Sequence, residues 1–199
     1  VSQALLHAAS LAGTRTIAEQ VQLEYGLTEP LRPVPVFAQS GEDPYDNVDK
    51  MILRGIDVLP HGLINSMAKV GPDAGALLEY VAWVASRVAT RRTRDDYRPV
   101  LHFDVYGTLG ILRSNDLKEI ARDIGRVREA ARPFDLRLEG PIDLGSREAQ
   151  IEGMAELRGL LRDQGTDVAI VADEWCNSLD DVRAFVAGDA ADMIQVKTP

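Results

Sequence analysis

The chain alternates short apolar runs with longer segments in which apolar residues recur at helical spacing. In segment 114–131, for example, the apolar positions form one stripe and the charged positions face the other way. Aliphatic and β-branched runs are typical of strands buried on both faces of a parallel sheet. The pattern predicts six strands: Pro35–Gln39, Ile56–Leu59, Val100–Val105, Leu136–Glu139, Val168–Asp173 and Met193–Lys197. It predicts long helices over Ala74–Arg91, Ser114–Ala131, Ser146–Gln164 and Leu179–Ala187.

This alternation of strands and helices predicts an α/β fold, either a barrel or an open doubly wound sheet. A dinucleotide-binding sheet would carry Gly-x-Gly-x-x-Gly after an early strand, and the nearest match, Gly107-Thr-Leu-Gly110, lacks that spacing. We therefore predict a (β/α)8 TIM-type barrel. It is expected to be incomplete, with about six of eight βα units, because 199 residues fall short of the roughly 250 of a complete barrel.

The opening segment has a different character. Residues 1–25 read as two helices, the second capped by Thr16, and they have no strand of their own. We expect a helical lead-in over residues 1–33 and the partial barrel, with strands one to six, over residues 34–199. Further expected helix N-caps are Ser114-Asn115, Ser146 and Ser178.

A polar or ionisable residue follows the apolar run of every predicted strand. In a barrel, the carboxyl ends of the strands meet at one mouth, where active sites lie. These residues are Gln39, His61, Asp104, Glu139, Asp173 and Lys197. We therefore expect them to gather at one end of the sheet.

Side chains alternate between the two faces of a strand, so the face of each residue near these strand ends can be predicted. His102 shares the inward face with Asp104, whereas Leu101 and Phe103 point outward to pack on helices. Polar groups buried without partners cost several kcal/mol, so the inward set indicates a compensating ligand. Taken singly, His102, which lies deeper in its strand, and His7 are interpreted as structural, hydrogen-bonded histidines.

Three of the strand-end residues are carboxylates, namely Asp104, Glu139 and Asp173, which are 35 and 34 residues apart. On adjacent parallel strands their like charges would repel and raise their pKa values unless a cation neutralised them. Hard oxygen ligands of this kind suit Mg²⁺. The alternative is that each carboxylate caps a helix or pairs with an arginine. Next to a divalent cation, the pKa of Lys197 would fall, which would leave a neutral amine able to take a proton.

Composition excludes other classes of function. The chain has 22 Lys and Arg against 31 Asp and Glu, a net charge of −9, which argues against a nucleic-acid surface. The basic cluster Arg91-Arg92-Thr93-Arg94 is followed at once by Asp95-Asp96 and reads as a solvated loop. Cys176 is the only cysteine, so no internal disulfide can form, and a reducing cytoplasm is the expected compartment. No apolar run approaches the roughly 18 residues of a membrane helix, so no membrane partner is expected.

Several short strings carry a resemblance to a known family. They run through the chain in order and resemble methylaspartate ammonia-lyase of the enolase superfamily, with Asp-Glu-Trp-Cys-Asn and Gln-x-Lys-Thr-Pro the more specific of them. The strings are Phe37-Ala-Gln-Ser40, Asp57-Val-Leu-Pro-His61, His102-Phe-Asp-Val-Tyr-Gly107, Leu138-Glu-Gly-Pro141, Val171-Ala-Asp-Glu-Trp-Cys-Asn177 and Gln195-Val-Lys-Thr-Pro199.

The resemblance implies a reaction and a cofactor. It implies reversible, Mg²⁺-dependent elimination of ammonia from L-threo-3-methylaspartate to give mesaconate, through proton abstraction next to a carboxylate and an enediolate intermediate. The Mg²⁺ ligands would be Asp104, Glu139 and Asp173, and the resemblance also allows a monovalent cation such as K⁺. It further implies a homodimer of the full-length protein, whose partner is a small amino dicarboxylate substrate.

Each remaining site residue takes an implied role. Lys197 would remove the C3 proton of the threo substrate, and His61 would lie across the substrate as the base for the other epimer. Gln39 and Gln195, with His61, would hold the substrate. A Lys or His base combined with Mg²⁺ is a known arrangement of enolase-type sites.

Departures from the family pattern are also informative. An N-terminal capping domain and the last two barrel strands are not recognisable, so we expect this chain to be inactive alone. Other branches of the superfamily carry Lys-x-Lys at strand two, where this chain has Pro60-His61-Gly62, which favours the ammonia-lyase branch. The alternatives are another enolase-superfamily carboxylate dehydratase or racemase, or a non-catalytic metal-binding fragment.

Overall fold

The computed structural model describes residues 2–41 and 43–196. It divides into two compact units, one that extends to Pro35 and one that starts at Val36. Predictions that concern Lys197 lie outside the described residues. Among the helices that the model describes, none is both long enough and apolar enough to cross a membrane.

The first unit consists of two helices that pack on each other, α1 (Ser2–Ala12) and α2 (Ile17–Tyr25). The Thr16 hydroxyl accepts a hydrogen bond from the Glu19 backbone N–H at 3.2 Å, and the Glu19 carboxylate accepts one from the Thr16 N–H at 2.7 Å. This reciprocal capping box satisfies backbone donors that have no partner inside the helix. Gly26, with φ of 61°, ends α2 in the left-handed conformation. The predicted helices and the Thr16 cap are confirmed.

The second unit is built on a five-stranded parallel sheet whose strands lie in sequence order, β1-β2-β3-β4-β5. The strands are β1 (Val58–Leu63), β2 (Val100–Asp104), β3 (Leu136–Glu139), β4 (Ala169–Ala172) and β5 (Met193–Ile194). The longer helices are α3 (Pro44–Arg54), α5 (Gly75–Arg91), α7 (Leu117–Ala130), α8 (Arg147–Asp163) and α9 (Leu179–Ala187). Three short helices, α4 (Met67–Val70), η1 (Pro72–Ala74) and α6 (Thr108–Leu112), lie between them.

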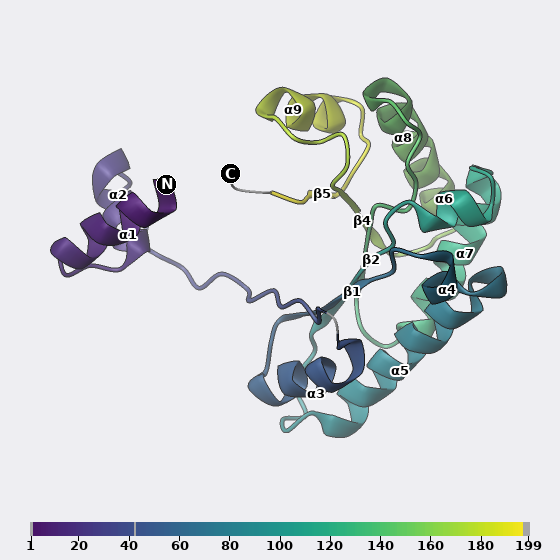
Figure 1. Cartoon of the computed structure of the whole chain (residues 1–199), viewed down its shortest axis with the longest axis horizontal. Coiled ribbons are helices and arrows are strands. Elements are labelled where there is room, and N and C mark those ends of the chain that lie inside the picture. Colours follow the sequence, from purple (N-terminus) through teal and green to yellow (C-terminus); the bar gives the residue numbers. More distant parts are fainter. Residues whose placement is uncertain (1, 42, 197–199) are drawn as a thin grey trace. The chain divides into compact units, whose positions relative to one another are not determined.

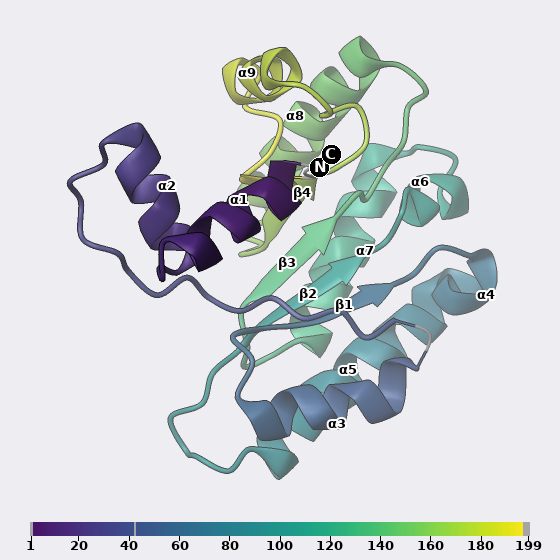
Figure 2. The same cartoon turned by 60° about the vertical axis from the view of Figure 1, so that its left-hand side comes forward.

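Consecutive helices lie side by side along one face of the sheet: α3 packs on α5, α5 on α7, and α7 on α8 (Figures 1 and 2). The hydrophobic core fills the space between this helix layer and the sheet. Leu101, Phe103 and Leu138 are fully buried there, together with Ile120 and Ile124 of α7. Burying each such side chain stabilises the fold by roughly 1.5–3 kcal/mol. The prediction of outward-packing Leu101 and Phe103 is confirmed.

Several predicted strands differ from those observed, and the strand predicted at Met193–Lys197 is observed only over Met193–Ile194 within the described residues. Segment Pro35–Gln39 forms only an isolated bridge, Phe37 to Val58, although the Ala38 N–H donates to the Val58 carbonyl at 3.1 Å. The Val58 N–H also donates to the Val36 carbonyl at 3.0 Å and the Ser40 N–H to the Pro60 carbonyl at 2.8 Å, but Pro60 itself has no N–H to add to this ladder. The strand predicted at 56–59 starts at Val58 and continues through Pro60 to Leu63, because a bulge at His61 lets pairing resume after the proline.

Two of the N-cap predictions in the second unit are confirmed and one is wrong. Ser146 and Ser178 cap α8 and α9 as expected. In contrast, α7 is capped by Asp116, whose carboxylate accepts from the N–H groups of Lys118 and Glu119. The predicted caps Ser114 and Asn115 instead form a left-handed turn just before Asp116, with φ of 50° and 59°. Helices α3, α4 and α6 were not predicted.

Candidate active site

His61 enters the site through a β-bulge in β1. Pro60 pairs with His102 and Gly62 with Phe103, so His61 is an extra residue between two paired ones, with φ of 46°. A Cβ on Gly62 would lie 2.9 Å from ring carbons of both Phe103 and Tyr80, so only glycine fits there. Bulges re-aim side chains, and this one turns His61 toward the neighbouring strands. His61 therefore lies within β1, not beyond its end as predicted.

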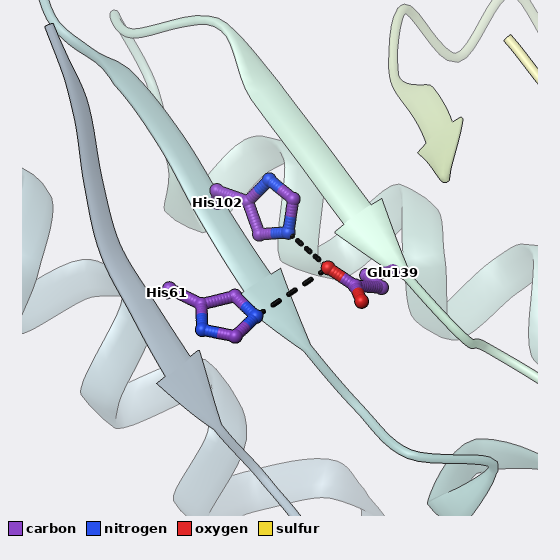
Figure 3. A group of neighbouring side chains, drawn as sticks. All are labelled: His61, His102 and Glu139. Atoms are coloured by element: carbon purple, nitrogen blue, oxygen red, sulfur yellow. Dashed lines mark hydrogen bonds and ion pairs between the residues drawn. The ribbon is translucent and has the colours of Figure 1, made fainter. Parts of the chain in front are cut away.

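Glu139 is the last residue of β3. Two buried histidines, His61 and His102, both contact the same carboxylate oxygen of Glu139 (Figure 3). Nε2 of His102 lies 2.7 Å from Oε2 of Glu139, and Nε2 of His61 lies 3.4 Å from the same oxygen. The ligand atoms of the three residues all lie within 4.8 Å of one another. Glu139 is 1% exposed, His102 3% and His61 8%.

A second contact orients His61. The side-chain nitrogen of Gln39 lies 2.7 Å from Nδ1 of His61. An amide nitrogen can only donate, so Nδ1 accepts, and the proton of neutral His61 is carried on Nε2, which faces Glu139. Gln39 therefore sets the tautomer of the histidine.

The two neighbouring carboxylates at the ends of β2 and β3 have opposite pKa shifts. Burial raises the pKa of Asp104, and the negative charge of Glu139 adds to this, giving about 7. Burial would also raise the pKa of Glu139, but the hydrogen bond from His102 and the nearby His61 ring outweigh it and lower the pKa to about 2. Burial lowers the pKa of His102. The charge of Asp104 is thus opposed by burial and by the negative charge of Glu139, both of which a bound cation would offset.

The structure brings the three predicted carboxylates to one edge of the sheet. Asp104 and Glu139 are direct partners in the β2–β3 register, and Asp173 follows the last residue of β4, the strand beside β3. All three are buried, with Asp173 7% exposed. Buried oxygen donors on adjacent strand ends are the kind of ligand set that fits Mg²⁺.

Sequence reasoning missed Glu174. A Cβ added to Gly140, which has φ of 56°, would lie 3.2 Å from a Glu174 carboxylate oxygen and 3.6 Å from Oδ1 of Asp104. The carboxylates of Glu174 and Asp104 therefore both lie beside Gly140. The negative charge of Glu174 contributes to the raised pKa of Asp104. Strict alternation along a strand would have placed Glu174 on the opposite face from Asp173. The strand has already ended at Ala172, and Trp175 turns with φ of 65°.

His102 was interpreted as a structural, hydrogen-bonded histidine. It is hydrogen-bonded, but its partner is Glu139, which places it inside the site. The signal for this was present in the sequence, because His102 precedes Asp104 by two residues and so shares its face.

The predicted substrate residues share one cavity. Gln39, His61 and Gln195 line a space of about 190 Å³, together with Phe37 and Ala38. The Phe37 ring lies edge-on to His61, with 5.1 Å between centroids. The Gln195 N–H donates to the Ala172 carbonyl at 2.8 Å, which extends the β4–β5 pairing to the cavity. Volumes of about 300–1,000 Å³ are usual for drug-sized ligands, so this cavity suits a smaller molecule.

Comparison with known proteins identifies the family. A family profile described as "Methylaspartate ammonia-lyase C-terminus" matches residues 29–199. Methylaspartate ammonia-lyase 1 of Carboxydothermus hydrogenoformans is 50% identical over 199 residues, which cover 100% of this chain and 47% of the relative. Methylaspartate ammonia-lyase of Clostridium tetanomorphum is 48% identical over 200 residues, which cover 100% of this chain and 48% of the relative.

Solved structures agree with this. A magnesium complex of β-methylaspartase from Clostridium tetanomorphum superposes with a TM-score of 0.88 at 47% identity, covering 98% of this chain and 47% of that one. A Citrobacter amalonaticus methylaspartate ammonia-lyase containing (2S,3S)-3-methylaspartic acid superposes with a TM-score of 0.91 at 42% identity, covering 100% of this chain and 48% of that one. The chain thus spans about half the length of the curated relatives it matches. With the profile covering residues 29–199, the chain belongs to the methylaspartate ammonia-lyase family.

Proposed function

We propose that the full-length protein of which this chain is part catalyses the reversible elimination of ammonia from L-threo-3-methylaspartate to give mesaconate, with Mg²⁺ as cofactor. The observation that carries this proposal is the cavity lined by Gln39, His61 and Gln195. His61 lines this cavity and also contacts the carboxylate of Glu139, so the cavity adjoins the proposed metal site. Relatives that are solved with magnesium or with methylaspartic acid support the choice of cofactor and substrate.

Asp104, Glu139 and Asp173 are the proposed Mg²⁺ ligands. The fit rests on three buried carboxylates at adjacent strand ends and on the raised pKa of Asp104, which indicates a surplus of negative charge. When bound, the cation would supply Lewis-acid stabilisation of the negative charge that builds on the substrate carboxylate. Like charges held together without a counter-ion would otherwise oppose the ionisation of the set.

The remaining roles belong to the chain's own side chains. Lys197 is the proposed base for the threo substrate, and His61 is the proposed base on the opposite side. Gln39 and Gln195 are proposed to hold the substrate carboxylates by donating amide hydrogens. The Gln39 contact leaves the proton of neutral His61 on Nε2, so Nε2 could accept a proton from the substrate only in the other tautomer, in which the hydrogen is on Nδ1 and the Gln39 amide oxygen accepts it.

We further propose that residues 34–199 form strands one to six of a (β/α)8 barrel and that residues 1–33 lead into it. The sequential parallel order and the helices on one face of the sheet support this, because both are features of a barrel wall. On this proposal the rest of the parent protein supplies the cap and the closing strands, and the active form is a cytoplasmic homodimer.

The test uses the full-length protein, 3-methylaspartate and Mg²⁺, with mesaconate followed by its ultraviolet absorbance. Asp173→Asn should abolish turnover, while Asp95→Asn, at an exposed loop position, should leave it unchanged. The proposal is overturned if the wild-type protein forms no mesaconate but turns over a different carboxylate substrate.

A further inference from the structure

His102 has no role in the proposed reaction, yet it is the more deeply buried of the two site histidines, at 3% exposure against 8% for His61. Its Nε2 lies 2.7 Å from Oε2 of Glu139. Since an ionised carboxylate can only accept, Nε2 carries the hydrogen and donates it. The matching distance for His61 is 3.4 Å, too long for a strong hydrogen bond, so His102 makes the main contact to this oxygen.

We propose that His102 is a positioning residue for the metal site: it holds Oε2 of Glu139 by donating from Nε2, and so presents the other carboxylate oxygen, Oε1, to the cation. The inference rests on the proposed function in one respect, namely that Glu139 is a Mg²⁺ ligand. It gives a specific role to a histidine that, from the sequence alone, was interpreted as structural.

The sheet register explains how one strand serves two ligands. His102 pairs with Arg137 and Asp104 pairs with Glu139 in the β2–β3 ladder. The His102 side chain therefore reaches diagonally, two positions along the neighbouring strand, to meet Glu139. Strand β2 thus carries its own proposed ligand at Asp104 and the group that restrains the next ligand at the end of β3.

The His102 ring is held tightly enough to act in this way. The Phe37 ring packs against it with 4.7 Å between centroids, and the His61 ring lies 5.3 Å away. Nδ1 is buried and has no hydrogen-bond partner among the described residues. An apolar side chain of the same size would fill this space without burying an unpaired nitrogen. The reason for a histidine at this position is therefore the hydrogen bond from Nε2 to Glu139.

A carboxylate ligand that lacks such a partner can rotate freely. Fixing its orientation when the metal binds then costs conformational entropy, which weakens the binding. Partners that hydrogen-bond to metal ligands typically change metal affinity or activity by about 10–100-fold when they are removed. The donated hydrogen bond is the property that matters, so a side chain of similar reach that also donates should replace the histidine. Glutamine does so, because its amide nitrogen can occupy the place of Nε2.

The experiment compares His102→Gln with His102→Met in the full-length protein. Methionine matches glutamine in length and flexibility but has no N–H. His7→Gln, at an exposed position on α1, is the control. Mg²⁺ affinity is measured by calorimetry on chelator-treated protein without substrate, and unfolding midpoints of the metal-free variants show whether each one folds. Turnover is then measured as a function of Mg²⁺ concentration.

We expect His102→Met to weaken Mg²⁺ binding by about 10–100-fold, and to regain turnover when Mg²⁺ is raised by the same factor. His102→Gln should stay within about threefold of wild type. Equal Mg²⁺ affinity in wild type and His102→Met overturns the inference, as does equal weakening in both variants, since that would show a loss of packing and not of the donor. Absence of Mg²⁺ binding to the wild-type protein would instead overturn the proposed metal site itself.

Discussion

The side-chain amide nitrogen of Gln39 lies 2.7 Å from Nδ1 of His61, across a separation of 22 residues in the chain. The contact joins the segment before α3 to the bulge of β1, and it keeps the His61 proton on the nitrogen that faces Glu139. Gln39 also lines the cavity. The same side chain therefore orients His61 and borders the space proposed for the substrate.

Replacing Gln39 with leucine should lower kcat/KM for 3-methylaspartate by about 10–100-fold, because its proposed hydrogen bond to the charged substrate carboxylate would contribute roughly 1.5–3 kcal/mol. Steady-state kinetics on the full-length protein measure this. Gln164→Leu, at an exposed position after α8, is the matched control and should be silent. Unchanged kinetics in Gln39→Leu would contradict the proposed double role.

The bulge that carries His61 depends on Gly62. Gly62→Ala should destabilise the protein by about 1–3 kcal/mol, because the new Cβ would lie 2.9 Å from the Phe103 and Tyr80 rings. Gly159→Ala, within α8 and with no atom within 4 Å of the new Cβ, should instead be neutral or stabilising by roughly 0.5–1 kcal/mol. Denaturant unfolding of the two variants tests the contrast, and equal stability of the two would show that the bulge tolerates a side chain.

Metal removal should lower thermal stability if the carboxylates form one site. A ligand present at 100 times its Kd stabilises the folded state by about 2.7 kcal/mol, so Mg²⁺ should raise the unfolding midpoint and a chelator should reverse the rise. Asp173→Asn should lose the Mg²⁺-dependent increase, which differential scanning calorimetry would detect. An equal increase in wild type and Asp173→Asn would remove Asp173 from the proposed ligand set.

An ion pair between α3 and α5 should make stability depend on pH. The Asp49 carboxylate accepts from Nε and Nη2 of Arg87 at 2.6 and 2.5 Å, and these bonds lower its pKa. A carboxyl group whose pKa is lower in the folded state stabilises that state above its unfolded pKa of about 3.9, and the contribution is lost as the pH falls through the folded value.

Arg87→Met should therefore cost stability at neutral pH, and the difference from wild type should shrink as the pH falls below about 3.9. The two side chains are 30% and 31% exposed, so we expect only about 1 kcal/mol. Arg183→Met, which removes an exposed i,i+3 pair with Asp180, should cost less than about 0.5 kcal/mol. Thermal unfolding across the pH range measures both, and a pH-independent loss in Arg87→Met would contradict the ionic explanation.

Local pattern predicted much of the second unit. Strand β3 (Leu136–Glu139) and helix α9 (Leu179–Ala187) have the predicted bounds, because period-2 and period-3.6 patterns depend only on near neighbours. The same local alternation predicted that Asp104 and Glu139 end their strands on the face opposite Leu101 and Phe103. Segment 44–54 was missed as a helix, although Asp43 caps it and Pro44 begins it.

Contacts distant in sequence account for what the pattern could not predict. His61 was expected beyond the end of its strand, but the close packing of Gly62 on Phe103 and Tyr80 accompanies a bulge that keeps it within β1. Glu174 approaches Asp104 beyond the end of β4 at Ala172, where the alternation of a strand no longer sets the direction of a side chain. The hydrogen bond from His102 to Glu139 joins residues 37 positions apart. The alternation of residues was therefore enough to indicate a parallel sheet with carboxylates at one edge. Which nitrogen of which histidine meets Glu139 depends on strand register and ring packing, which arise only when distant segments fold against each other.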